Sequence, residues 1–407
     1  MNSKSPEIRF NGFTDDWEQR KLEEVFNQTV EYVDPKESNL QLWSVTVEKG
    51  LTPKTKRYNR EALVKKTDKF KVVHPGNIVY NPMNMTIGSV GFNNNSKSVA
   101  VSGYYVTMSM NEGFSNNYFS NWLPSQRAIQ LYKMYATGSL IEKQRVQFPT
   151  LSSIKTHLPS FKEQEKIGNF LNKLNETIAL HQRELDNLIK SKKGFLQKMF
   201  PKKDEKTPEI RFNEFTGDWQ EHKLGELSPL RGGFAFKSSE FSDNGVPIVR
   251  ISNILSSGIV GGDYAYYNVQ DKDDNYLLPD RAAVLAMSGA TTGKVSILEN
   301  PYNRKVYQNQ RVGYFVKTIN ADYEFISTLV RSKLFTDQLA SVLVAGAQPN
   351  VSSKDIDGFK FMVPSDIQEQ HKIGKFFKQI DDTIVLHQHQ LDKLKQTKKA
   401  FLQKMFV

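Results

Sequence analysis

Two short segments come close to motifs that do chemistry on nucleotides, and both depart from them. Residues 289–295, Gly-Ala-Thr-Thr-Gly-Lys-Val, are similar to a phosphate-binding loop, but they have one residue too few between the glycines. Val295 also stands where a serine or threonine would hold Mg²⁺. Asn81-Pro82-Met83-Asn84 is similar to an Asn-Pro-Pro-aromatic motif that holds a flipped base, but the second proline and the aromatic are missing. Since the sequence has no glycine-rich cofactor loop, Ser-His-Asp pattern or metal cluster either, we expect a recognition protein without catalytic residues or a cofactor of its own.

A run of cations in the first half of the chain has the chemistry of a phosphate-contacting segment. Residues 49–71 contain nine lysines and arginines against only Glu61 and Asp68. Such side chains contact DNA phosphates, although they equally form ordinary solvated faces. From this segment we select as candidate DNA-binding residues Lys54, Lys56, Arg57, Tyr58, Arg60, Lys65 and Lys66.

Candidates in the remainder of the chain are scattered. Side chains that contact base edges are typically arginine, lysine, asparagine and glutamine, although asparagine also fills turns. On that ground we add Asn81, Asn84, Arg231, Lys237, Arg250, Asn253, Lys294, Asn309, Gln310, Arg311 and Gln348.

The bulk properties fit a protein with a polyanionic partner. The 407 residues carry a net charge of +11, which is spread unevenly, because residues 207–366 are slightly acidic. The chain contains no cysteine, so disulfides and thiolate metal sites are excluded. No run approaches the length of an apolar membrane span, and the first residues do not form a signal peptide, so we expect a cytoplasmic protein without a membrane partner.

The chain is built from two repeats. Residues 163–200 recur as residues 369–406 without a gap, with 22 of 38 positions identical. Upstream of each copy, Pro-Glu-Ile-Arg-Phe…Asp-Trp at 6–17 recurs at 208–219 with 10 of 12 positions identical. The stretches between these repeats differ in sequence but keep a faint common template of short strands and turns, which predicts related α/β folds with different surfaces.

Each long repeat carries an apolar seam with heptad spacing, which is typical of a coiled-coil helix pair. The predicted seam residues are Ile167, Leu171, Leu174, Ile178, His181, Leu185 and Leu188 in the first copy and Ile373, Phe377, Ile380, Ile384, His387, Leu391 and Leu394 in the second. The alternative is that each helix packs only on its own neighbouring domain. We favour antiparallel pairing of the two helices, with each helix tail near the opening motif of the other copy. The two seam histidines then set register rather than bind a metal.

With both repeats in view, the chain resembles the DNA-specificity subunit of type I restriction–modification systems. The resemblance covers essentially the whole length. It rests on the paired openings that end at Trp17 and Trp219, on Gln-x-Lys-Ile at 164–167 and 370–373, and on Phe-Leu-Gln-Lys-Met-Phe at 195–200 and 401–406.

The resemblance implies an α+β fold. Two α/β target-recognition domains are separated by an antiparallel two-helix coiled coil in a pseudo-two-fold, quasi-circular arrangement. The expected divisions are an opening motif (1–19), target-recognition domain 1 (20–160), helix 1 (161–200), a linker with the second opening motif (201–219), target-recognition domain 2 (220–366) and helix 2 (367–407).

The resemblance also implies a non-catalytic subunit that recognises an asymmetric, bipartite site in double-stranded DNA. Such a subunit assembles with two methyltransferase subunits, which use S-adenosylmethionine to methylate adenine N6, and with restriction subunits, which use ATP and Mg²⁺. The faces of the helix pair beyond the seam are the candidate docking surfaces. Two alternatives stay open: a stand-alone sequence-specific DNA-binding regulator, and a single-chain restriction–methylation enzyme with catalytic residues outside known motifs.

Overall fold

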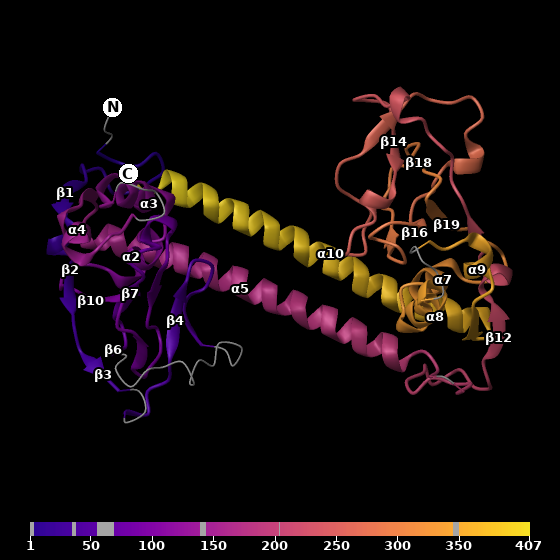
Figure 1. Ribbon diagram of the computed structural model, residues 1–407, viewed down its shortest axis with the longest axis horizontal. Helices are drawn as coiled ribbons and strands as arrows, with labels where there is room; N and C mark the ends of the chain where they lie inside the picture. The colour runs from indigo at the N-terminus through magenta and orange to yellow at the C-terminus, as the bar shows by residue number, and fades with distance from the viewer. Residues whose placement is uncertain (1–3, 35–37, 55–68, 139–143, 203, 345–349) are drawn as a thin grey trace. The chain divides into compact units, whose positions relative to one another are not determined.

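The computed structural model describes residues 4–34, 38–54, 69–138, 144–202, 204–344 and 350–407 (Figure 1). The chain divides into two compact units. Unit 1 consists of residues 1–183 and 389–407, and unit 2 consists of residues 184–388. Among the described residues, no helix combines the length and the apolar character that a membrane span needs.

Unit 1 contains a four-stranded antiparallel sheet in the order β2-β10-β7-β8 and a three-stranded sheet in the order β3-β6-β9. Two further pairs are β4 with β5 and β1 with β11. The strands are β1 (Glu18–Lys21), β2 (Phe26–Thr29), β3 (Tyr32–Val33), β4 (Trp43–Thr46), β5 (Gly50–Pro53), β6 (Phe70–Val73), β7 (Ile78–Tyr80), β8 (Val90–Phe92), β9 (Val99–Ser102), β10 (Val106–Met110) and β11 (Lys155–Leu158). The short helices are α2 (Asn116–Trp122), α3 (Gln126–Tyr135) and α4 (Phe148–Ser153).

Unit 2 contains a four-stranded sheet in the order β13-β19-β16-β17, a three-stranded sheet β15-β14-β18 and the pair β12 with β20. The strands are β12 (Gln220–Lys223), β13 (Leu230–Arg231), β14 (Val246–Val249), β15 (Ala265–Tyr267), β16 (Ala283–Ala286), β17 (Val295–Ile297), β18 (Tyr307–Gln308), β19 (Val312–Phe315) and β20 (Lys360–Val363). The short helices are α6 (Leu224–Leu227), α7 (Tyr323–Leu329), α8 (Lys333–Val344) and α9 (Ser353–Asp357).

The four-stranded sheets of the two units share one topology. Counted along the chain, β2, β10, β7 and β8 correspond to β13, β19, β16 and β17, and their order in the sheet is the same. The three-stranded sheets differ, since β6 pairs antiparallel with β9 whereas β14 pairs parallel with β18. The prediction of related folds is therefore confirmed, and the three-stranded sheets show where the two folds diverge.

The two long helices, α5 (Phe161–Lys198) and α10 (Ile367–Lys404), pair antiparallel within each unit. In unit 2 the rings of Phe195 and Phe376 lie 5.1 Å apart, and Lys192 Nζ lies 2.5 Å from Asp381 Oδ1. A step toward the start of α5 is thus a step toward the end of α10, which is the antiparallel direction. In unit 1 the rings of Phe170 and Phe401 meet at 4.9 Å. The predicted antiparallel pairing is confirmed.

The seam serves two kinds of packing. All 14 seam residues are buried or half-buried. The first two seam residues of each helix, however, enter the core of the adjoining domain: Ile167 and Leu171 pack in the cluster that contains Tyr118, and Ile373 and Phe377 pack in the cluster that contains Phe325. The long helices therefore pair with each other and also pack on the adjoining domain, and the alternative that each helix packs only on its own domain is wrong.

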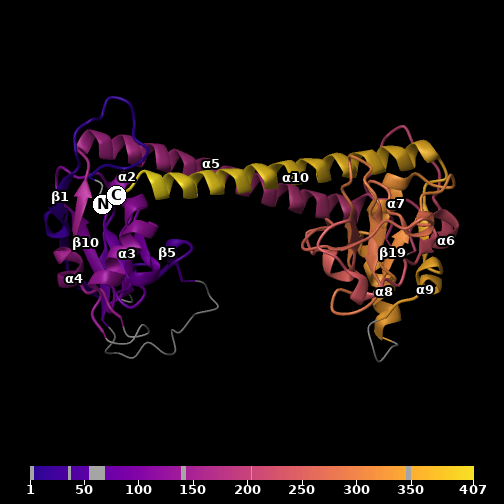
Figure 2. The same ribbon diagram turned by 90° about the horizontal axis from the view of Figure 1, so that it is seen from above.

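A glycine in each long helix permits this close packing against the adjoining domain. A Cβ on Gly168 would lie 2.4 Å from the backbone of Asn117 in α2, and a Cβ on Gly374 would lie 2.5 Å from Phe325 N in α7. Real side chains do not tolerate such distances, so glycine is required at both positions. Figure 2 shows α7 beside the first turns of α10.

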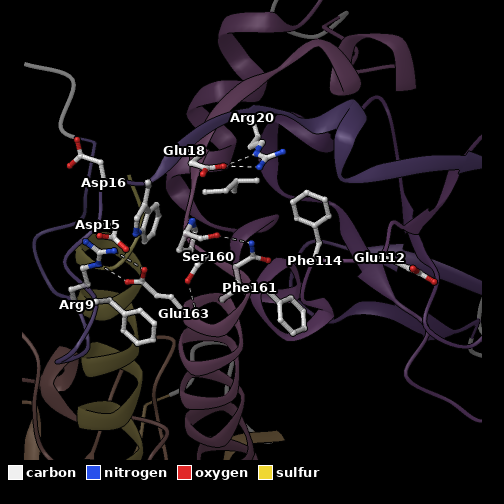
Figure 3. A pocket seen from close by; sticks show the side chains of 16 residues that line it. Arg9, Asp15, Asp16, Glu18, Arg20, Glu112, Phe114, Ser160, Phe161 and Glu163 are labelled. Atoms are coloured by element: carbon white, nitrogen blue, oxygen red, sulfur yellow. Dashed lines mark hydrogen bonds and ion pairs between the residues drawn. The ribbon is translucent and has the colours of Figure 1, made fainter.

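The opening motifs attach to the helix starts by buried ion pairs. Arg9 Nε and Nη2 donate to the two carboxylate oxygens of Glu163 at 2.7 and 2.8 Å (Figure 3). Arg211 makes the same bidentate pair with Glu369 at 2.7 and 2.8 Å. Both carboxylates are 1% exposed, and the hydrogen bond to each raises the pKa of its arginine. The Pro-Glu-Ile-Arg-Phe repeats therefore position the long helices.

The helix tails also meet the opening motifs, as a quasi-circular chain requires. Ile8 N donates to Lys404 O in unit 1, and Ile210 N donates to Lys198 O in unit 2. Phe406 then packs against Tyr118 at 5.4 Å between ring centroids, in the way that Phe200 packs against Phe325 at 5.7 Å. Each unit thus contains the start of one long helix and the tail of the other.

Candidate nucleic-acid interface

In unit 2, loops from four different places in the sequence meet where β16 ends and β19 begins. Phe234 N donates to Gln308 O, and Gln310 N donates back to Phe234 O. Asn309 N donates to Val249 O at the end of β14, and Met287 N donates to Arg311 O. We call residues 232–237, 250–256, 287–294 and 309–311 the unit 2 loop end. Because backbone hydrogen bonds join the loops, the side chains that they carry have fixed relative positions.

Most of the candidates selected in this half of the sequence lie on the unit 2 loop end. Lys237, Lys294, Gln310 and Arg311 are exposed, and Arg250 and Asn309 are half-buried. Lys237 pairs with Glu240 at 3.2 Å, and Lys294 Nζ donates to Ser256 Oγ at 2.8 Å. Residues scattered over 75 positions of sequence are therefore brought to one edge of the sheet, with cations and amides side by side.

Two of the selected residues hold the fold together instead. Asn253 is fully buried; its Nδ2 donates to Gly261 O and Asp263 O at 3.0 Å, and its Oδ1 accepts from Arg250 N at 3.0 Å. Arg231 donates to Leu277 O at 2.6 Å and to Gln308 Oε1 at 3.0 Å. Burial lowers the pKa of the Arg231 guanidinium. These hydrogen bonds of both side chains thus go to groups of unit 2 itself.

The equivalent edge of unit 1 is formed by the loop after β7, and we call it the unit 1 loop end. Val146 N donates to Pro82 O there, as Val351 N donates to Met287 O in unit 2. Asn81 Oδ1 accepts from Met83 N at 3.0 Å and so shapes the turn, whereas the side chain of Asn84 is exposed. Lys54 is exposed after β5. The candidates Lys56, Arg57, Tyr58, Arg60, Lys65, Lys66 and Gln348 lie outside the described residues.

The segment that is similar to a phosphate loop is a turn between two antiparallel strands. Gly293 N donates to Ala286 O at 2.8 Å and thereby continues from β16 toward β17, which pair antiparallel. A phosphate loop instead connects a strand to a helix, whose N-terminus holds the anion. The segment 289–295 therefore lacks the geometry of a nucleotide site as well as its sequence.

Two exposed aromatic side chains are absent from the candidates selected from the sequence. Phe234 on the unit 2 loop end is 43% exposed, and Tyr32 in unit 1 is 54% exposed. The ammonium groups of Lys69 and Lys71 lie 5.3 and 5.8 Å from the centroid of the Tyr32 ring. Only the fold shows which aromatic side chains face solvent.

The hollow beside the first opening motif is acidic, unlike the unit 2 loop end (Figure 3). Its lining includes the carboxylates of Asp15, Asp16, Glu18 and Glu112 together with the Arg9–Glu163 pair. Carboxylates outnumber guanidinium groups there, which disfavours a DNA phosphate. We therefore assign this hollow to the joint between opening motif and helix.

Three pairs of apolar side chains are exposed at equivalent repeat positions in the two units. They are Ile8 and Ile210 in the opening motifs, Phe161 and Ile367 at the helix starts, and Leu180 and Leu386 in mid-helix, all at least 36% exposed. Exposure of one apolar residue is ordinary, but exposure at equivalent positions of both units marks these positions as candidate contact points that occur twice. Next to Leu386 in the chain, His387 Nδ1 lies 3.6 Å from Glu184 Oε2 in unit 2.

Comparison with known proteins matches both halves of the chain to one family. Residues 14–191 and again residues 216–396 match the family described as type I restriction modification DNA specificity domain. Together these two stretches cover most of the chain.

Curated relatives and a solved structure agree with that match. The chain is 28% identical over 262 residues to the type I restriction enzyme MjaVIII specificity subunit of Methanocaldococcus jannaschii, covering 61% of this chain and 60% of the relative. It is 23% identical over 183 residues to the type I restriction enzyme EcoBI specificity subunit of Escherichia coli, covering 41% of this chain and 38% of the relative. The crystal structure of a type I restriction-modification system S subunit from M. genitalium shares the fold, with a TM-score of 0.68, 16% identity and 99% of both chains covered.

Proposed function

Because this chain belongs to the type I restriction modification DNA specificity family, we propose that it is a non-catalytic subunit that recognises a bipartite site in double-stranded DNA. The observation that carries the proposal is that the two units share one sheet topology but have different loop ends. A repeated scaffold fixes the geometry, while unlike loops at equivalent sheet edges supply unlike contacts. Two domains of this kind recognise two different half-sites, and the whole site is then asymmetric.

Recognition divides between phosphates and bases. Exposed lysines and arginines such as Lys237, Lys294 and Arg311 contact phosphates, which fixes the position of the protein on the duplex. Exposed amides such as Gln310 and Asn84 contact base edges in the major groove, where each base pair presents a distinct pattern of donors and acceptors. The exposure of these side chains at the sheet edges supports this division.

The interface is tested by Arg311→Gln in the assembled complex. We expect affinity for the target duplex to fall about tenfold and the slope of log affinity against log salt to fall by about one, because one cationic contact is lost. The measurement is fluorescence anisotropy over a salt series. Arg304→Gln is the matched control, because Arg304 is an exposed arginine of unit 2 in the loop between β17 and β18, outside the unit 2 loop end. Equal affinities for both variants would place the DNA on another surface.

The partners proposed here are those that the family resemblance implies, and the repeated exposed side chains support a place where they dock. Two methyltransferase subunits dock on the two units, one near Leu180 and one near Leu386, because the same surface occurs twice. Restriction subunits join this assembly. S-adenosylmethionine, ATP and Mg²⁺ bind to the partners, and the assembly acts on DNA in the cytoplasm.

The docking proposal predicts a stepwise loss of mass. Leu180→Glu and Leu386→Glu are each expected to yield complexes with one methyltransferase, and the double variant none, since a charge on a buried apolar contact costs several kcal/mol, about 3. Native mass spectrometry counts the subunits. Ile189→Lys is the control, because Ile189 is 49% exposed and its repeat equivalent is already a lysine, Lys395. Complexes of full mass for both glutamate variants would refute docking at these leucines.

A further inference from the structure

We propose that Phe234 is a specificity-determining residue, which packs against the 5-methyl group of one thymine in the half-site that unit 2 recognises. The inference rests on the proposed function and adds the chemistry of one contact. It concerns a side chain that neither the charge pattern nor the polar candidates of the sequence pointed to.

Phe234 is a large apolar side chain fixed on a surface of polar loops. Its backbone N–H donates to Gln308 O at 2.9 Å, and its carbonyl accepts from Gln310 N at 2.8 Å. Its ring stacks on Tyr276 with centroids 4.8 Å apart and meets the edge of Phe236 at 5.0 Å. Despite these contacts the residue stays 43% exposed. Binding to it therefore requires little ordering of the side chain.

The layer beneath Phe234 holds it in place. Tyr276 meets the ring of Tyr307 at 5.2 Å, and the Tyr307 hydroxyl donates to Asp273 Oδ2 at 2.9 Å. The preceding residue, Gly233, lies so close to the next strand that a Cβ there would be 2.3 Å from Gln308 O. Only glycine allows this approach, so the backbone that presents the ring is set by the sequence.

The neighbours of Phe234 identify what it faces. Asn309, Gln310 and Arg311 follow directly on the strand that bonds to it, and Gln310 and Arg311 are exposed. These are the side-chain types that hydrogen-bond to base edges and phosphates. A phenyl ring has no donor or acceptor, and the apolar group that base edges offer in the major groove is the thymine methyl. The ring of Phe234 therefore fits the thymine methyl of an A·T base pair. The neighbouring amides fit flanking base pairs that are recognised through hydrogen bonds.

Insertion of the ring between base pairs fits the geometry less well. A wedge that separates two base pairs needs both faces of the ring, as in proteins that kink DNA from the minor groove. One face of Phe234 is covered by Tyr276, whose ring plane is tilted by only 29°. The remaining face and edge suffice for a methyl group.

The test removes the methyl group from the DNA and the ring from the protein. The assembled complex, purified with its partners, is bound to duplexes that carry its modified motif, and each thymine of the second half-site is replaced in turn by deoxyuridine. We expect one replacement to weaken binding by about three- to tenfold, as loss of one buried methyl group implies. Phe234→Ala should bind the thymine duplex and the deoxyuridine duplex equally. Its affinity for both should be about as weak as that of the native complex for the deoxyuridine duplex. Phe234→Leu should regain part of the preference for thymine over deoxyuridine.

Two controls separate the possible failures. Tyr302→Ala removes an aromatic side chain that is 80% exposed and lies in the loop between β17 and β18, and it should leave the discrimination unchanged. Deoxyuridine in the first half-site should affect the native complex and Phe234→Ala alike. A native complex that selects its motif but ignores deoxyuridine throughout the second half-site, or a second half-site without thymine, overturns the Phe234 contact and leaves the proposed function intact. A complex that binds motif and scrambled DNA equally overturns both.

Discussion

A fragment that ends at Lys206 is expected to form a stable homodimer. The core of unit 1 includes Met405 and Phe406 from the tail of α10, which such a fragment lacks. Its own tail, residues 195–200, has the same sequence as residues 401–406, and in unit 2 it fills the equivalent place beside Trp219. The tail of one copy can therefore complete the core of the other, and burial of several aromatic side chains at about 2 kcal/mol each makes dimerisation nearly complete.

Sedimentation equilibrium at micromolar concentration measures this directly. Phe200→Glu in the same fragment is the control, because Phe200 would take the place of Phe406 against Tyr118, and this variant should be monomeric. The homodimer should bind a palindrome built from the first half-site, since it carries two copies of one loop end. A folded fragment that sediments as a monomer would mean that the two tails are not interchangeable.

The second large effect is expected at Asp381 on α10. Its carboxylate bridges Lys192 Nζ on α5 at 2.5 Å and Arg331 Nη1 at 2.7 Å, and all three side chains are less than 20% exposed. Asp381→Asn leaves two cations close together without their counter-charge, and removing one partner from such a buried cluster typically costs about 3–5 kcal/mol. Thermal unfolding of the variant should therefore occur about 6–15 °C lower.

The pH dependence of this cluster has a defined sign. Burial acts to raise the pKa of the Asp381 carboxyl, but the charges of Arg331 and Lys192 outweigh it, so the pKa lies below its usual range. Because the folded-state pKa is depressed, the stabilisation is present above the pKa of an unfolded aspartate, about 3.9, and is lost as the pH falls through the folded-state value. The difference in stability between native protein and Asp381→Asn should thus vanish in acid.

The repeat provides a matched control. The position equivalent to Asp381 in unit 1 is Asn175, whose Nδ2 donates to Asn121 Oδ1 at 3.1 Å. Further amide bonds, from Asn121 to Asn172 and from Asn172 to Asn117, join α5 to α2 there without charges. Asn175→Ala should cost only about 1 kcal/mol and show no acid dependence. Equal losses for the two variants would show that charge is not what stabilises the unit 2 joint.

The sequence was sufficient to predict the repeated frame. Heptad spacing is a local pattern, and residues such as Leu185 and Leu391, buried at 4% and 1% exposure, follow from it directly. The two repeats predicted two equivalent units, because the residues that they share make equivalent contacts. The Arg9–Glu163 pair was beyond such an argument, since its partners are 154 residues apart and no local period connects them.

The interface was predictable in composition but not residue by residue. Polar type alone selected both Gln310, which is exposed, and Asn253, which is fully buried and bonded to loop carbonyls. Burial is decided by contacts between distant loops, so sequence type cannot separate the two. Phe234 was missed for the converse reason, because an apolar residue is assigned to the core until the fold shows it at the surface.

The central claim is that each unit recognises one half of a bipartite DNA site. It is tested most directly by sequencing modified bases in the DNA of the native host. The experiment compares a strain that has this chain with a strain in which its gene is deleted. The account predicts N6-methyladenine in an asymmetric motif of two separated halves, which disappears on deletion. Exchange of residues 20–150 for another recognition domain should change one half of the motif and leave the other. A motif that persists without this chain, or an exchange that alters both halves, would contradict the assignment of one loop end to each half-site.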